Sequence, residues 1–81
     1  MIDLQPLAAT LGCGFISISS RRFAGETFGR WEFAGWKVGV DTDADLPTDL
    51  EARHFPDVGG CIVADVTAVG PRRLELLLVD C

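Results

Sequence analysis

The chain has 81 residues and a formal net charge of −5, and 48% of its residues are hydrophobic. A chain of this length forms one domain, so we expect residues 1–81 to fold as a single compact unit. Disorder is excluded because it requires low hydrophobicity, and no apolar run reaches the roughly 18 residues of a membrane-spanning helix. The start of the chain lacks the basic segment of a secretory signal, so we expect a cytoplasmic protein.

The negative charge is confined to one segment of the chain. Residues 41–57 contain six acidic side chains and one arginine, whereas the rest of the chain contains equal numbers of acidic and basic side chains. Direct nucleic-acid binding is not expected, because it depends on a basic face that neutralises phosphates. A concentrated negative segment instead favours docking on a basic surface of another macromolecule.

The first predicted element is a short helix that ends before Gly12. Its apolar residues recur at helical spacing and form one stripe: Leu4, Leu7, Ala8 and Leu11. Pro6 suits the first turn of a helix, and Gly12 suits a C-terminal cap.

Three strands are predicted next, over residues 13–21, 30–33 and 36–41. In the first of them, Ile16 and Ile18 alternate with polar residues, as in a half-buried strand. Residues 23–29 are predicted to form a turn region. The second and third strands flank Ala34-Gly35, which predicts a hairpin turn at that dipeptide.

A second short helix is predicted at about residues 49–55, because Thr48 and Glu51 match a capping box and Pro56 cannot continue a helix. Two final strands, residues 61–69 and 74–80, are predicted on either side of a turn. The order α-β-β-β-α-β-β with short connections indicates an α+β fold. We expect a small, mostly antiparallel sheet of about five strands with two short helices.

The stretch DTDADLPTDLE, residues 41–51, contains five acidic residues: Asp41, Asp43, Asp45, Asp49 and Glu51. Its start resembles a calcium-binding EF-hand loop, but Leu46 stands where that loop needs glycine and Ala52 where it needs glutamate. Two interpretations remain open. A solvated turn with a helix cap explains the later acids. A docking patch explains why three carboxylates at alternate positions are kept despite their mutual repulsion.

The cysteines Cys13, Cys61 and Cys81 are odd in number and widely spaced, so we expect free thiols rather than a disulfide framework. Together with His54 they supply four possible zinc ligands, but none occurs in the close pairs typical of structural zinc sites. A Cys–His nucleophile needs a thiol beside the imidazole, and any of the three thiols could supply it, but a domain this small rarely forms a substrate cleft as well. We therefore expect no metal, no cofactor and no catalytic residue.

Two arginine pairs, Arg21-Arg22 and Arg72-Arg73, each lie beside a predicted turn. They are interpreted as solubilising charge. Alternatively, they contact an acidic partner or the 41–57 segment of a second copy, since arginine binds carboxylates with fork-like geometry.

The profile of a short, acidic, compact chain without a catalytic motif is similar to that of many phage-encoded inhibitors, including anti-CRISPR proteins. This resemblance implies a non-enzymatic inhibitor that occludes a basic nucleic-acid-binding surface. In this first hypothesis the five acids of residues 41–51 act as a nucleic-acid mimic toward a larger protein or ribonucleoprotein, without a membrane and without direct nucleic-acid binding. The alternatives are a structural or adaptor subunit, including a homodimer that buries a sheet edge, and a metal or thiol enzyme that uses cysteine and His54.

Overall fold

Four antiparallel strands form one sheet in the computed structural model, which describes residues 4–14 and 16–81. The strands are β1 (Ile16–Thr27), β2 (Arg30–Thr42), β3 (Ile62–Gly70) and β4 (Arg73–Val79). They lie in the order β1-β2-β4-β3. The described part also contains one α-helix, α1 (Gln5–Leu11), and one 3-10 turn, η1 (Ala52–His54). The α+β class is as predicted, although the strands number four rather than five.

The helix α1 matches its prediction closely. Gly12 ends the helix in the left-handed conformation, with φ of 70°, and its N–H bonds back to carbonyl oxygens of the last turn. Leu7 and Leu11 are each 2% exposed, so the predicted apolar stripe is the face that packs on the sheet.

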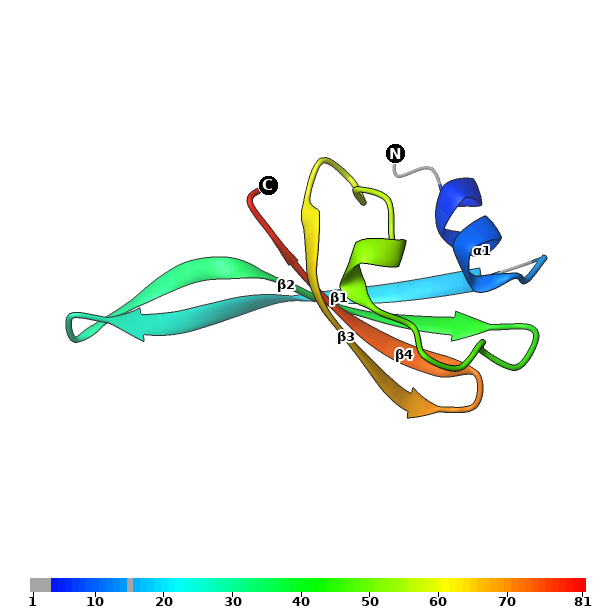
Figure 1. Cartoon of the computed structure of the whole chain (residues 1–81). Helices are drawn as coiled ribbons and strands as arrows, with labels where there is room; N and C mark the ends of the chain where they lie inside the picture. Colours follow the sequence, from blue (N-terminus) through cyan, green and yellow to red (C-terminus); the bar gives the residue numbers. More distant parts are fainter. Residues whose placement is uncertain (1–3, 15) are drawn as a thin grey trace.

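The core lies on one face of the sheet, beneath α1 and the segment of residues 46–61 (Figure 1). Burial along β4 alternates, so that Leu74, Leu76 and Leu78 face this core. Val40 of β2 is fully buried beside them. Strand β4 is central in the sheet, with β2 and β3 on either side.

The predicted turn at Ala34-Gly35 is wrong, and this error accounts for the extra predicted strand. The chain reverses instead at Phe28-Gly29, where both residues have positive φ (51° and 77°). The ladder between β1 and β2 continues past Ala34 with a register shift, so the two predicted strands are one. Gly35 is required there for packing, because a Cβ atom would overlap the backbone carbonyl oxygen of Leu78.

The hairpin of β1 and β2 reaches beyond the rest of the sheet (Figure 1). Strand β4 pairs with β2 only over residues 36–41, so residues 23–35 form a two-stranded extension, here called the arm. The arm lengthens the molecule to 43 Å. It also raises the radius of gyration to 13.1 Å, against about 12 Å for a compact chain of this length.

The second predicted helix is reduced to the single turn η1. Asp49 has a φ of 63°, which a right-handed helix does not allow, so no helix begins at Thr48. The start of η1 is capped by its own last residue: the N–H of Glu51, which precedes the turn, donates a hydrogen bond to Nδ1 of His54 at 3.2 Å. None of the helices in the described ranges is long and apolar enough to cross a membrane.

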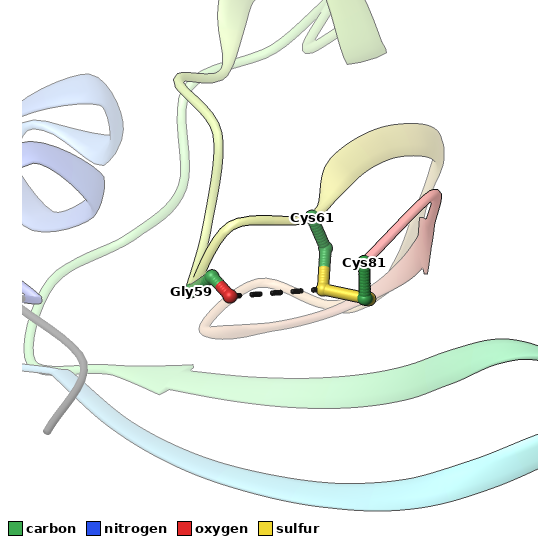
Figure 2. The surroundings of a disulfide bond; sticks show 3 residues. All are labelled: Gly59, Cys61 and Cys81. Atoms are coloured by element: carbon green, nitrogen blue, oxygen red, sulfur yellow. Dashed lines mark hydrogen bonds between the residues drawn. A yellow bond between two sulfur atoms is a disulfide. The ribbon is translucent and has the colours of Figure 1, made fainter.

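The prediction of three free thiols is also wrong, because Cys61 and Cys81 form a disulfide (Figure 2). Cys61 precedes β3 and Cys81 follows β4, and the neighbouring residues Ile62 and Val79 are paired in the sheet. Antiparallel pairing of the two strands therefore brings both cysteines to one end, with their Cα atoms 4.2 Å apart. The remaining cysteine, Cys13, lies outside this disulfide and is half-buried.

Candidate functional site

The acidic loop, residues 41–51, runs from the end of β2 toward η1 and lies against the turn between β3 and β4. The Thr42 N–H donates to the Arg72 carbonyl at 2.9 Å, and the Leu46 N–H donates to the Pro71 carbonyl at 2.7 Å. The Thr42 hydroxyl donates to the Ala44 carbonyl at 2.6 Å. Two backbone hydrogen bonds therefore hold the first half of this loop against the turn, independently of its carboxylates.

Three of the five acids form ion pairs with arginines of the same chain. The pairs are Asp41–Arg73 (2.6 Å), Asp45–Arg72 (3.0 Å) and Glu51–Arg53 (2.5 Å). The paired side chains are between 43% and 77% exposed, so each pair adds little stability and its carboxylate remains open to solvent. The arginine pair Arg72-Arg73 therefore lies against the acidic loop.

Asp43 and Asp49 have no ion-pair partner within residues 4–14 and 16–81. Both are exposed. Five acids set against three arginine partners leave the loop and its contacts with a net charge of −2. Asp43 and Asp49 are therefore the carboxylates whose charge is least compensated within the chain.

A groove of about 490 Å³ lies between the acidic loop and the ends of β3 and β4 that meet at their connecting turn. Its sheet side is lined by Val66, Ala68 and Leu74, and its loop side by residues 45–50. Leu46 and Leu50 are the large apolar residues of the loop side, and Asp45 and Asp49 are its acidic residues. The groove therefore combines an apolar lining with two acidic groups.

The structure does not gather all five predicted site residues at one place. Asp45 and Asp49 line the groove, whereas Asp41 pairs with Arg73 of β4 and Glu51 caps the start of η1. The sheet residues of the groove were missed by sequence reasoning. Val66 and Ala68 are ordinary strand residues, and only the pairing of β3 with β4 brings them next to the loop.

The possible zinc site and the possible Cys–His site lose most of their candidate residues in the structure. The disulfide removes two of the four possible zinc ligands, and no group of three or more potential metal ligands occurs among the residues that the structure describes. His54 is exposed, and its Nδ1 accepts the capping hydrogen bond from Glu51. The first arginine pair, Arg21-Arg22, lies within β1 rather than at a turn.

Comparison with known proteins identifies no relative: no family profile, no curated protein and no solved structure matches this chain.

Proposed function

We propose that this chain is a small non-enzymatic binding protein whose acidic loop and adjoining groove take up a basic segment of a larger protein or ribonucleoprotein. It acts by occlusion, as an inhibitor that mimics the negative charge of nucleic acid. The cellular location proposed for this activity is the cytoplasm. The single observation that carries the proposal is that Asp45 and Asp49 line an apolar groove in the segment that holds the whole net charge.

The chemistry of the groove fits a lysine or arginine side chain. Such side chains combine an aliphatic stem, which packs on apolar surface, with a cationic head that carboxylates bind. Val66 and Leu74 would contact the stem, and Asp45 and Asp49 would accept hydrogen bonds from the head. Asp43, which is exposed on the same loop outside the groove lining, would steer a basic surface toward the loop.

The test compares two variants of equal charge. The loop variant carries Asp43→Asn, Asp45→Asn and Asp49→Asn, and the control variant carries Asp57→Asn, Asp65→Asn and Asp80→Asn. Both should fold, because the loop is held by backbone hydrogen bonds and an exposed ion pair contributes at most about 1 kcal/mol. Asparagine also tolerates the positive φ of Asp49 and Asp80.

Tagged protein is incubated with host-cell lysate at low and moderate salt, and the captured proteins are identified. We expect the native chain and the control variant to capture the same nucleic-acid-handling protein, with less captured as salt increases. The loop variant should lose this protein. Equal capture by all three chains would refute the role of the loop.

A second candidate function is supported by a separate observation. The outer edge of β1 carries no partner strand in the described ranges, so the chain is also suited to act as a subunit that associates through its sheet.

A further inference from the structure

The face of the sheet opposite the core contains a small polar pocket. Leu74 and Leu76 of β4 face the core, so Glu75 between them faces the other side. Gly39 of β2 pairs with Glu75 on one side and with Ser19 of β1 on the other. These three residues line a pocket of about 220 Å³. The pocket therefore lies on the other side of the sheet from the groove beside the acidic loop.

Three cationic residues line the pocket, one from each of its three strands. They are Arg21 of β1, Lys37 of β2 and Arg73 of β4. Arg21 and Lys37 stand directly opposite each other in the β1–β2 ladder. Like charges in opposed positions destabilise a sheet, and an anion bound between them would remove that repulsion. The Arg21 side chain is exposed and forms no ion pair within residues 4–14 and 16–81.

Gly39 provides the space into which the guanidinium of Arg73 extends. A Cβ atom at position 39 would overlap Nη2 of Arg73, so this end of the guanidinium lies directly over the glycine. The other end of the guanidinium is held from outside the pocket, because Nη1 donates a hydrogen bond to Asp41 at 2.6 Å. Arg73 is therefore positioned by the acidic loop while its Nη2 reaches the pocket.

The charge of the lining matches a doubly charged oxyanion. Three cationic residues and one acidic residue, Glu75, give the lining a net charge of +2. Glu75 forms no ion pair in the described ranges, so its carboxylate can accept a hydrogen bond from a ligand. Hydrogen phosphate carries two negative charges and one P–O–H donor. Sulfate carries the same charge without a proton, so Glu75 would repel it.

We propose that this pocket binds inorganic hydrogen phosphate. Arg21, Lys37 and Arg73 donate charge-assisted hydrogen bonds to the phosphate oxygens, since guanidinium and ammonium groups both bind phosphate. Glu75 accepts the hydrogen bond of the P–O–H group. The bound anion also separates the opposed charges of Arg21 and Lys37. The site uses the sheet face and not the acidic groove, so its failure would leave the function proposed above unchanged.

The first test titrates the full chain with inorganic phosphate at constant ionic strength and follows the backbone amide signals by NMR. The amide of Gly39 and those of the other pocket residues should shift and reach saturation. Sulfate should bind about tenfold more weakly, because it cannot donate to Glu75. Glycerol phosphate above neutral pH should also bind more weakly, because a phosphate ester has then lost its second proton.

Shifts that stay linear across the phosphate titration, or equal binding of sulfate, would overturn the proposal. Equal or tighter binding of glycerol phosphate would overturn the choice of the free anion and identify an esterified phosphate as the ligand.

The second test uses three variants, each checked for folding by circular dichroism. Arg21→Gln should weaken phosphate binding about tenfold, because it removes one charge-assisted hydrogen bond. Arg53→Gln removes the same charge outside the pocket and should leave binding unchanged. Glu75→Gln should abolish the preference for phosphate over sulfate, since the repulsion of sulfate is removed. Equal weakening by Arg21→Gln and Arg53→Gln, or an unchanged preference in Glu75→Gln, would overturn the site.

Discussion

Single residues decide where the strands of this protein turn and where they pass close to each other. Phe28 and Gly29 adopt positive φ and make the hairpin turn, although Phe28 does not favour that conformation. Gly35, the residue that looks most like a turn signal, lies instead in β2 against the backbone of β4. A glycine in a strand therefore reports close backbone approach here, rather than a reversal of the chain.

This difference is testable with two alanine substitutions. Gly35→Ala should lower the free energy of unfolding by about 3 kcal/mol, because the new Cβ overlaps the Leu78 carbonyl and the rigid backbone must move. Gly25→Ala, where a Cβ would meet nothing within 4 Å, should leave stability nearly unchanged. Urea denaturation of both variants measures the two effects. Similar stabilities for both variants would contradict the close approach at Gly35.

At the scale of elements, the pair β3–β4 is held by its ladder and by the disulfide that closes its open end (Figure 2). The sulfur of Cys61 lies 3.9 Å from the Gly59 carbonyl oxygen. A disulfide sulfur carries no proton, so this is a packing contact rather than a hydrogen bond. The cross-link stabilises the strand pair mainly by restricting the unfolded chain.

Reduction should lower the free energy of unfolding by about 3 kcal/mol, as expected for a loop closed over a sequence separation of 20. Urea denaturation with and without reductant measures the change, and a Cys61→Ala, Cys81→Ala variant should not respond to reductant. Thiol titration of the unfolded chain should find one thiol before reduction and three after it. Three thiols without reductant, as a reducing cytoplasm favours, would show that the native form is the dithiol.

At the scale of the whole molecule, the four-stranded body and the two-stranded arm should differ in local stability. The buried residues of β2 and β4 share one hydrophobic cluster with α1, whereas the tip of the arm is exposed. Local opening is easiest where few apolar contacts are buried, so stability should fall from the body to the tip.

Hydrogen exchange should resolve this gradient. In dilute protein, amides of residues 24–33 should exchange faster than those of residues 36–41 and 74–78, which lie in the four-stranded part. Uniform exchange across both regions would contradict the division into body and arm.

Local sequence patterns were sufficient to predict those parts of the fold that depend on residues close together in the chain. The stripe of Leu7 and Leu11 and the cap at Gly12 predicted α1. They were insufficient where distant residues decide. Whether Gly35 turns the chain depends on Leu78, and whether Cys61 is free depends on Cys81.

For the candidate site too, one part could be predicted from the sequence and the other part depended on contacts between distant segments. The sequence by itself determined that all net charge lies in residues 41–57, because charge is a property of composition. Only the tertiary structure decided which acids are neutralised and which line a groove. Pairing of β3 with β4 brings Arg72 and Arg73 beside the loop, and it supplies the apolar surface of Val66 and Leu74. Such contacts join segments far apart in the chain, and no local pattern encodes which segments will meet.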